Sequence, residues 1–591
     1  MSESEDALYE VQWSQELGRY LVAVRDIKAR EIIIREDPLM SGPTDRGPKD
    51  VPVCLGCCNI MSEDSMTRCT NCHWPVCNED CEKLPLHAEN ECQIFHKNRV
   101  VYPPPFRSPI IHKCVFILRC LLLKSKNLTS WEKLNAMADN GEERRNKPIC
   151  INSDKKIMEN FRKFFPNGDF SEEDVIRISG IVDVNAHSFP IRINDRPTSV
   201  CNLYSRTSLM AHSCIPNASW SADKSLSSLT LTIRANVPIS KGEMISVAYV
   251  EGQLLVCTLQ RLIPNEINGM FICRCPRCLD PTENSTYIGA LKCPSCEHGY
   301  LLPIDPVDSF SSWKCDNGNN GTSCCTSSAT SVANINRSDD TNVENDDRIR
   351  SKDGCSVVLD DETIMEMIEE AEMMCGYTKM DFGSDSVPEE SLSLLKEFVE
   401  EYSGKILHPN HYILQEVDVR ILKGEFAKGL RVLSDVELIQ FLERCERLFT
   451  LSNALTPGYC EYRAFLQFHF SQGLLSLEKR KKKRNFVPGN LPTSKNTREE
   501  GEKDANVTNH VHHDDEDDSV VSTVFTRKFE SSLDNLNKVM EMLTYLLTYF
   551  EEINSTHKLL EPIKDTITDT EKKLKRLLKQ EAKESSSSTQ K

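Results

Sequence analysis

Short apolar runs in the first half of the chain follow the pattern of β-strands. Residues 20–24 and 31–35 are rich in Val and Ile, and residues 226–235 alternate apolar with polar positions. Alternation with a period of two is typical of a strand that buries one face. We expect the first two runs to pair as a hairpin at the start of a β domain, and residues 244–249 to add a further strand.

Apolar residues at helical spacing predict α-helices elsewhere. Residues 110–126 contain an apolar run that is interrupted by Arg119. Because this run is shorter than the ~18 residues that a membrane span needs, we expect a buried helix. Residues 171–193 should form another helix and a strand. From Glu362 onward, apolar residues recur every three or four positions, which predicts a helical C-terminal domain. Its helices pair without a strict repeat of about 34 residues, and a tetratricopeptide-like (TPR-like) layer is compatible with that pattern.

Three polar segments separate or end these regions. Residues 326–355 are rich in Ser, Asn and Asp, which predicts a disordered loop. Residues 479–520 begin with a basic run, 479–484, and contain a later acidic run, so we expect a solvated insertion between helices. The basic run also resembles a nuclear localisation signal. Residues 583–591 should form a disordered tail.

The length and charge of the chain narrow its class. Its 591 residues are enough for roughly three to four domains. The formal net charge is −18, so bulk attraction to phosphates is absent and we do not expect direct nucleic-acid binding. Residues 1–6 are acidic and polar, unlike a signal peptide. We therefore expect a protein of the nucleus, the cytoplasm or both, without a membrane span, whose cysteines stay reduced.

Eight of the 26 cysteines lie between Cys54 and Cys92. A CxxC turn presents two thiolates to one ion, and zinc takes four sulfur or nitrogen ligands in a tetrahedron. Four ligand pairs are enough for two zinc ions, and Cys58 is left over. A disulfide framework is the alternative, which a reducing compartment disfavours. The predicted ligands are Cys54, Cys57, Cys69, Cys72, Cys77, Cys81, His87 and Cys92.

A second group of cysteines lies between Cys273 and Cys325. Three of them are closely spaced: Cys273, Cys275 and Cys278. Three ligands leave one corner of the tetrahedron around a zinc ion to be filled. The others have the loose spacing of a zinc ribbon: Cys293, Cys296, Cys315 and either Cys324 or Cys325. We expect a further zinc site there or, as the alternative, a reduced and flexible loop.

Several segments resemble the core of SET-domain lysine methyltransferases. Residues 208–217 read Ser-Leu-Met-Ala-His-Ser-Cys-Ile-Pro-Asn, similar to the family's NHSCxPN segment. Residues 241–249 resemble the strand with the active-site tyrosine, residues 273–278 resemble the post-SET zinc knot, and residues 18–20 resemble a cofactor-contacting turn. A zinc cluster is inserted between these segments, and helices follow them in the sequence. This order of segments resembles that of the SET and MYND domain-containing (SMYD) family. The Met-Ala-His-Ser-Cys setting resembles its arthropod-specific branch.

The resemblance implies an α+β fold. A β-rich SET domain would contain an inserted MYND zinc finger and a post-SET zinc knot, and an all-α TPR-like C-terminal domain would follow. The implied parts are the N-terminal part of the SET domain (1–50), the MYND finger (54–92), the SET insertion helices and core (97–260), the post-SET region with the possible ribbon (261–325) and the C-terminal helices (356–582).

The resemblance also implies a site for S-adenosylmethionine and a protein lysine. Tyr249 would be the catalytic residue and orient the lysine amine, and Asn217 would hold the crossing of two loops. Cys214 would join the three post-SET cysteines on a third zinc ion. The MYND finger would bind a proline-rich peptide. The residues expected to contact the cofactor are Gly18, Arg19, Tyr20, His187, Ala211, His212, Tyr249 and Phe271.

Three positions depart from the family's pattern. Ala211 and His187 stand where many members have Asn, and Gly269 stands where many have a second active-site tyrosine. Each missing hydrogen bond costs about 1–3 kcal/mol. We expect a monomeric lysine methyltransferase of histone or non-histone proteins, with a role in chromatin regulation. The alternative is a catalytically weakened SET scaffold whose MYND finger recruits partners in transcriptional regulation.

Overall fold

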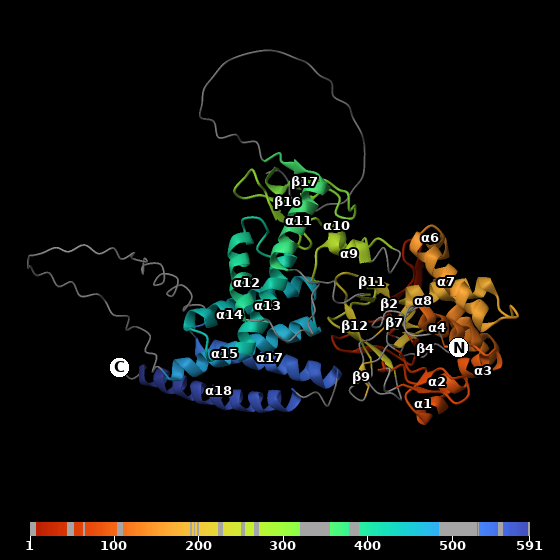
Figure 1. Ribbon diagram of the computed structural model, residues 1–591. Helices are drawn as coiled ribbons and strands as arrows, with labels where there is room; N and C mark the ends of the chain where they lie inside the picture. Colours follow the sequence, from red (N-terminus) through yellow and green to blue (C-terminus); the bar gives the residue numbers. More distant parts are fainter. Residues whose placement is uncertain are drawn as a thin grey trace, which may run out of the picture.

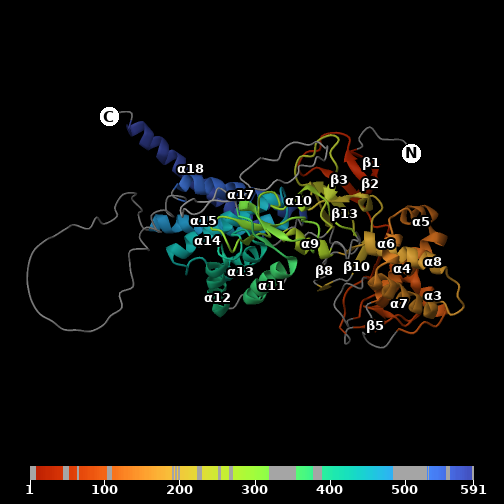
Figure 2. The ribbon, with the colours of Figure 1, turned by 90° about the horizontal axis from the view of Figure 1, so that it is seen from above.

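The computed structural model describes residues 8–43, 52–62, 66–102, 110–188, 192–193, 196–197, 200–222, 229–249, 255–264, 271–318, 355–376, 389–483, 529, 531–553 and 559–588. The N-terminal strands and helices form one half of the molecule, and the helices after residue 360 form the other half (Figure 1). The same division is visible from above (Figure 2). No helix within the described residues is long and apolar enough to cross a membrane.

The first two strands pair with each other. β1 (Tyr9–Ser14) and β2 (Gly18–Ala23) form an antiparallel hairpin. Gly18 begins β2 with a φ of 67°, a conformation that glycine adopts without strain. β3 (Ile32–Glu36) pairs instead with β13 (Leu231–Ala235). The predicted pairing of β2 with β3 is therefore wrong, because the local pattern identifies a strand but not its distant partner.

The remaining strands of this half form small sheets. β13 lies between β3 and β12 (Ala218–Ala222), and its alternate residues Leu231, Ile233 and Ala235 are buried, as the alternating pattern predicted. Three further sheets follow: β4 (Met40–Pro43) with β10 (Val200–Leu203) and β7 (His187–Ser188), β11 (Ala211–His212) with β14 (Ser246–Val247), and β8 (Arg192–Ile193) with β9 (Arg196–Pro197).

A small zinc-finger-like module and five helices are inserted between β4 and β7. α4 (Ile110–Lys126) lies where the sequence predicts a buried helix, and most of its apolar residues are buried. Phe116 of α4 packs so closely on Gly42 that a Cβ on this glycine would lie 2.5 Å from the ring. α4 therefore rests directly on a strand of the β-rich core. The other elements are β5 (Thr67–Arg68), β6 (Pro75–Val76), α1 (Glu79–Lys83), α2 (Pro85–Ala88), α3 (Glu91–Lys97), α5 (Leu128–Asn135), α6 (Gly141–Arg145), α7 (Pro148–Phe164) and α8 (Glu172–Asn185).

A four-stranded sheet and a helical domain make up the rest of the described chain, as the sequence pattern predicted for the helices. α14 begins at a capping box of Ser434 and Glu437, which fixes its first turn. The elements are α9 (Thr258–Pro264), α10 (Pro276–Leu279), β15 (Leu291–Lys292), β16 (Tyr300–Pro303), β17 (Trp313–Cys315), β18 (Val358–Leu359), α11 (Asp361–Cys375), α12 (Glu389–Tyr402), α13 (Tyr412–Lys428), α14 (Asp435–Leu455), α15 (Glu461–Lys483), α17 (Ser532–Ile553) and α18 (Leu560–Ser588).

Two helices extend beyond the predicted boundaries. α15 continues to Lys483, through the start of the basic run that we expected in a solvated insertion. Arg480 donates hydrogen bonds of 2.7 Å to the carbonyl oxygens of Leu430 and Leu433, and it pairs with Asp435 at 2.7 Å. These partners hold the basic segment against α14. α18 similarly continues to Ser588, through part of the expected disordered tail.

Candidate functional site

Three aromatic rings meet where two distant segments cross. β11 pairs with β14 in parallel, so His212 lies beside Val247 and close to Tyr249. The ring centroids of His212 and Tyr249 are 5.1 Å apart, and Phe271 lies 5.4 Å from His212 and 5.9 Å from Tyr249. We call these three residues the aromatic group. The structure thus brings together three of the residues expected to contact the cofactor, although they are far apart in the sequence.

The Tyr249 hydroxyl has a defined partner. It donates a hydrogen bond of 2.8 Å to the carbonyl oxygen of Met210, which directly precedes Ala211. The residue is 45% exposed, so part of it is open to solvent. Burial of the hydroxyl end raises the pKa of Tyr249 to about 12, so the hydroxyl is protonated at neutral pH and acts as a donor.

The His212 ring connects Tyr249 to the neighbouring cysteines. Burial lowers the pKa of His212 to about 4, so the imidazole is neutral. Its Nδ1 accepts the backbone N–H of Tyr249 at 3.2 Å, and its Nε2 lies 3.3 Å from Cys214 Sγ. Because Nδ1 is an acceptor, Nε2 carries the proton and donates to the sulfur. One ring therefore fixes Tyr249 relative to Cys214.

The amide of Asn217 holds the crossing of the two segments. Its Oδ1 accepts the backbone N–H of Ser246 at 2.8 Å, and its Nδ2 donates to the carbonyl oxygen of Met244 at 2.8 Å and to Glu243 at 3.0 Å. The side chain is 8% exposed. A buried amide with these partners ties the loop after β11 to the strand that leads to Tyr249.

The other predicted cofactor contacts lie around this crossing. β2, which contains Gly18, Arg19 and Tyr20, packs against the 3-10 turn η2 (Thr207–Leu209) just before Ala211. The Arg19 side chain donates to the carbonyl oxygen of Ala136, and the Tyr20 hydroxyl donates to Gln12 at 3.4 Å. These two side chains thus have partners within the protein.

His187 lies in β7. Its ring contacts Tyr204 and Trp220 edge-on, with centroids 5.9 and 5.8 Å away. The Trp220 indole donates to the carbonyl oxygen of Ala248 at 3.4 Å, immediately before Tyr249. His187 therefore supports the strand of Tyr249 through Trp220. Gly269, the third departure from the family's pattern, lies outside the described residues.

Cys214 forms a four-thiol cluster with the post-SET cysteines. The ligand atoms of this group all lie within 4.8 Å of one another; its members are Cys214, Cys273, Cys275 and Cys278. The Cys214 sulfur is 3.9 Å from that of Cys273 and 3.5 Å from that of Cys278. Since zinc–sulfur bonds of about 2.3 Å give tetrahedral S–S edges of about 3.8 Å, the cluster fits one zinc ion.

Two buried guanidinium groups lie behind this cluster. Arg261 donates to Cys278 Sγ at 3.3 Å, and Arg277 donates to the carbonyl oxygen of Cys214 at 3.3 Å. Both also donate to Glu283 Oε2, at 2.8 and 3.0 Å. Four thiolates around one divalent ion carry a net negative charge, and these cations offset it. They also orient the ligands from outside the first coordination sphere.

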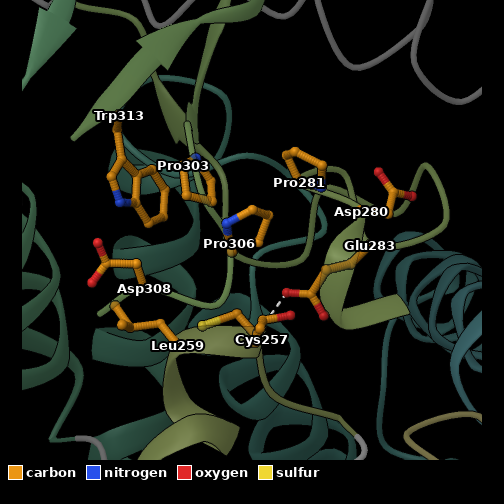
Figure 3. Close-up of a pocket in the computed structure, with 11 residues that line it drawn as sticks. Cys257, Leu259, Asp280, Pro281, Glu283, Pro303, Pro306, Asp308 and Trp313 are labelled. Carbon is orange, nitrogen blue, oxygen red and sulfur yellow. Dashed lines mark hydrogen bonds between the residues drawn. The ribbon is translucent and has the colours of Figure 1, made fainter. Parts of the chain in front are cut away.

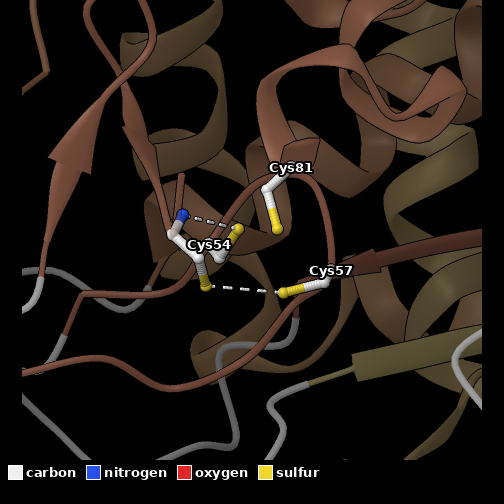
Figure 4. Close-up of side chains that lie close together, drawn as sticks. Cys54, Cys57 and Cys81 are labelled. Atoms are coloured by element: carbon white, nitrogen blue, oxygen red, sulfur yellow. Dashed lines mark hydrogen bonds between the residues drawn. The ribbon is translucent and has the colours of Figure 1, made fainter. Parts of the chain in front are cut away.

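The eight predicted ligands of the zinc finger form two interleaved groups. The first and third pairs meet in one group, Cys54, Cys57, Cys77 and Cys81; the second and fourth pairs meet in the other, Cys69, Cys72, His87 and Cys92. Figure 4 shows three thiols of the first group facing one another. The sulfur atoms of Cys57 and Cys77 are 3.7 Å apart, as are those of Cys69 and Cys92. No disulfide bond joins the cysteines that the structure describes, so the disulfide alternative has no support there.

A buried charged chain connects the finger to α4. His87 Nε2 faces the second thiol group, and its Nδ1 lies 2.8 Å from Glu91. Arg119 of α4 binds the same carboxylate through two hydrogen bonds of 2.8 and 2.6 Å. Burial alone would raise the pKa of Glu91, but the Arg119 charge outweighs it and holds this pKa below its usual range. His87 lies in α2 and Glu91 begins α3, so this contact depends on how the two short helices join, which the sequence pattern did not reveal.

Arg119 also reaches the main chain on both sides of the finger. Its guanidinium donates to the carbonyl oxygens of Leu55 at 2.7 Å and Ser41 at 3.3 Å. Leu55 follows the first ligand, Cys54, whereas Ser41 belongs to β4. One side chain therefore joins both thiol groups of the finger to the β-rich core, a role that the sequence did not reveal.

A fourth thiol cluster contains three predicted ligands and one cysteine that was not predicted as a ligand. Its members are Cys293, Cys296, Cys315 and Cys355. The expected fourth ligand, Cys324 or Cys325, lies outside the described residues. The composition of residues 326–355 predicts that Cys355 ends a disordered loop, whereas the structure places its thiol beside the other three.

A small pocket lies between α9 and the four-stranded sheet (Figure 3). Pro303, Pro306 and Trp313 line one side, and Glu283 accepts the backbone N–H of Thr258 at 2.6 Å on the other. None of the eleven lining residues belongs to the aromatic group. The pocket is therefore separate from the residues predicted for methyl transfer.

A parallel strand pair locked by a buried amide, beside a thiol cluster and an aromatic group, defines the class of protein as one with a SET domain. Residues 18–250 match the family model of the SET domain. Residues 18–250 therefore form a SET domain, and the chain is also similar to two curated relatives with a SET domain.

Those relatives are two forms of one Drosophila melanogaster protein. The chain is 28% identical over 300 residues to SET domain-containing protein SmydA-8, isoform A, and 28% identical over 309 residues to isoform B. Each match covers 50% of this chain, and the two matches cover 62% and 64% of the relatives' own length. A solved structure, the SET domain of LSMT bound to lysine and AdoHcy, aligns with 12% identity and a TM-score of 0.22 over 82% of this chain and 89% of the other, a score too low to support an argument.

Proposed function

We propose that this SMYD-like protein is an S-adenosylmethionine-dependent protein-lysine N-methyltransferase that acts on a histone or non-histone protein. The observation that carries the proposal is the aromatic group, with the Tyr249 hydroxyl bonded to Met210 and its backbone bonded to His212. A tyrosine that is fixed at both ends and partly exposed is suited to orient a lysine amine.

The residues around the crossing fit a cofactor in part. A Cβ built on Gly18 meets no described atom within 4 Å, so the backbone of this turn is open to a ligand. Gly18, Ala211 and His212 would hold the cofactor, and Phe271 would cover it. Bound S-adenosylmethionine supplies an electrophilic methyl group. The Tyr249 hydroxyl, whose proton goes to Met210, would accept a hydrogen bond from the amine through its oxygen and direct the amine toward that group, while Phe271 would exclude water.

The departures from the family's pattern weaken this site without removing its central residue. Ala211 offers no side-chain hydrogen bond to a cofactor, and His187 is engaged with Tyr204 and Trp220. The loss of one such hydrogen bond costs about 1–3 kcal/mol, or roughly a factor of ten in affinity. Tyr249 and His212 keep their contacts. We therefore propose weakened cofactor binding with retained chemistry.

Three structural zinc ions belong to the proposal. Two would occupy the interleaved groups of the finger, and one would occupy the group of Cys214 with the post-SET cysteines. The third ion would fix His212 through Cys214, and Phe271 through the nearby Cys273. Metal binding at this position would thus assemble the aromatic group.

A scaffold is the second candidate function. Ala211 favours it, because a SET domain that has lost a cofactor contact can persist for binding alone. The finger would then recruit a partner such as a proline-rich peptide in transcriptional regulation. The two functions differ in whether methyl groups are transferred.

Transfer of tritiated methyl from S-adenosylmethionine to histones and to a lysine peptide array tests the proposal. We expect incorporation with the wild-type chain and a loss of about 100-fold with Tyr249→Phe, since a misoriented amine reacts slowly. Tyr459→Phe removes a hydroxyl in the C-terminal half and should leave the rate unchanged. Equal rates for wild type and Tyr249→Phe would contradict the role of Tyr249. A folded, zinc-loaded wild type that labels no substrate would favour the scaffold.

A further inference from the structure

The fourth thiol cluster has the geometry of a closed metal site. All four sulfur atoms lie within 4.8 Å of one another. The sulfur atoms of Cys293 and Cys355 are 3.7 Å apart, and those of Cys296 and Cys315 are 3.6 Å apart. These distances match the edge of about 3.8 Å expected around zinc and are far longer than a disulfide bond of about 2.0 Å. They also match the spacings in the finger and in the Cys214 cluster.

Three of the four thiols come from two parts of the four-stranded sheet, the turn between β15 and β16 and the end of β17. Cys293 and Cys296 lie on the turn between β15 and β16, where the backbone N–H of Cys293 donates to the carbonyl oxygen of Gly299 at 3.0 Å. Cys315 is the last residue of β17. A Cβ on Gly299 would lie 2.2 Å from Cys315 Sγ and 2.8 Å from Cys296 Sγ. The thiols therefore pack directly over a backbone position that only glycine allows.

Cys355 enters the cluster because the chain returns to the sheet. The backbone N–H of Cys315 donates to the carbonyl oxygen of Val357 at 3.0 Å, and that of Cys355 donates to Asn317 at 3.3 Å. The Asn317 amide in turn donates to Cys296 Sγ at 3.7 Å, as a residue outside the first coordination sphere would. The pairing of β17 with β18 thus delivers the fourth ligand in register.

We propose that Cys293, Cys296, Cys315 and Cys355 bind a fourth structural zinc ion, which closes the long segment between Asn317 and Cys355 and fixes the start of the helical domain. Four thiolates leave no position for a substrate, so the site is structural rather than catalytic. Binding releases the thiol protons and forms four zinc–sulfur bonds. In this proposal the four described thiols fill the tetrahedron without Cys324 or Cys325.

The position of the site explains what the ion would stabilise. β18 leads directly into α11, and the core around Trp313 and Cys315 continues into α11 through Ile364 and Ile368. On the other edge of the sheet, Lys292 donates its backbone N–H to Ile406 at 2.8 Å. The ion therefore sits at the junction of the sheet with the C-terminal helices, away from the aromatic group. Its loss should loosen this junction first.

Elemental analysis of the full-length chain, purified under reducing conditions, tests the proposal. We expect four zinc ions per wild-type chain, three for Cys355→Ser, and four for the matched double variant Cys324→Ser/Cys325→Ser. Gly299→Val should also lose one ion, because the side chain would occupy the space of the thiols. Three ions in the wild type, four in Cys355→Ser, or a loss in the double variant would each overturn the proposal.

A ligand exchange keeps the test valid if Cys355→Ser folds poorly. Cys355→His preserves a three-cysteine, one-histidine set, which zinc accepts, so it should retain four ions. In the cobalt-substituted chain, the visible absorption of tetrahedral Co²⁺ should lose about a quarter of its intensity in Cys355→Ser. In Cys355→His the absorption should instead shift in wavelength. Hydrogen exchange should accelerate in α11 and not in α4. An unchanged cobalt spectrum in both variants would refute the assignment of Cys355.

Discussion

Replacement of Arg119 by methionine tests how the finger is joined to the β-rich core. Arg119 and Glu91 are both fully buried, and the guanidinium binds the carboxylate at 2.8 and 2.6 Å. The guanidinium also donates hydrogen bonds to the carbonyl oxygens of Leu55 and Ser41. Arg119→Met fills a similar volume but leaves the Glu91 charge without its partner.

Because the ion pair is buried, Arg119→Met should cause a large loss in the free energy of unfolding. Breaking a buried ion pair by removal of one member costs about 3–5 kcal/mol, because the remaining charge is uncompensated. For a unit of 150–250 residues this corresponds to a decrease in melting temperature on the order of 10 °C. The zinc content should stay unchanged, since Arg119 is not a ligand. Zinc should nevertheless leave faster to a chelator, because Glu91 no longer holds His87 firmly.

Thermal unfolding followed by circular dichroism measures this effect, with Arg162→Met as the matched control. Arg162 pairs with Glu172 at 3.0 Å, but both side chains are more than half exposed. Its removal should cost less than about 1 kcal/mol. The double variant Arg119→Met/Glu91→Gln should recover part of the stability, since a neutral amide replaces the orphaned charge. Equal melting temperatures for Arg119→Met and Arg162→Met would refute the reasoning.

Three further predictions concern a zinc ligand, the hydrogen bonds of Asn217 and the loss of stability at low pH. Cys54→Ser should release one zinc ion by elemental analysis and loosen the finger in hydrogen exchange, and unchanged metal content would contradict the ligand assignment. Asn217→Ala should lower the free energy of unfolding by about 2–4 kcal/mol, measured in urea, because the buried side chain loses three hydrogen bonds. Burial alone would raise the pKa of Asp183, but the charges of Lys113 and Arg144 lower it. The folded pKa thus lies below the unfolded one, so Asp183 stabilises the fold above about pH 4 and this contribution is lost as the pH falls. The stability of Asp183→Asn should therefore fall less than that of wild type on acidification, and parallel acid titrations would argue against the ion pairs.

The sequence predicted features that depend on local spacing. The CxxC pairs indicated two zinc sites in the finger, and their ligands do gather in two groups. The apolar run around Arg119 indicated a buried helix, which is α4. Spacing alone did not show which pairs share an ion, because the interleaving depends on how the module folds. Nor did it show that the single charge in the run has a buried carboxylate as its partner.

Features that depend on distant partners were missed. β3 pairs with β13, which lies near the other end of the SET domain in the sequence. The predicted pairing of β3 with the preceding strand, β2, was therefore wrong. Cys355 follows a long polar segment that obscured its pairing with the ribbon strands, and Cys324 and Cys325 were nearer in sequence. Arg480 looked like part of a solvated basic run, but it binds two carbonyl oxygens next to α14. In each case the deciding contact is long-range.

Titration of S-adenosylmethionine into the full-length, zinc-loaded chain tests the central claim most directly. The aromatic group of His212, Tyr249 and Phe271, together with the open turn at Gly18, predicts saturable binding by isothermal calorimetry, with competition by S-adenosylhomocysteine. Phe271→Ala should weaken that binding, whereas Tyr459→Phe should not change it. A folded wild-type chain that shows no binding heat and no competition would contradict the assignment of this SET domain as a methyltransferase.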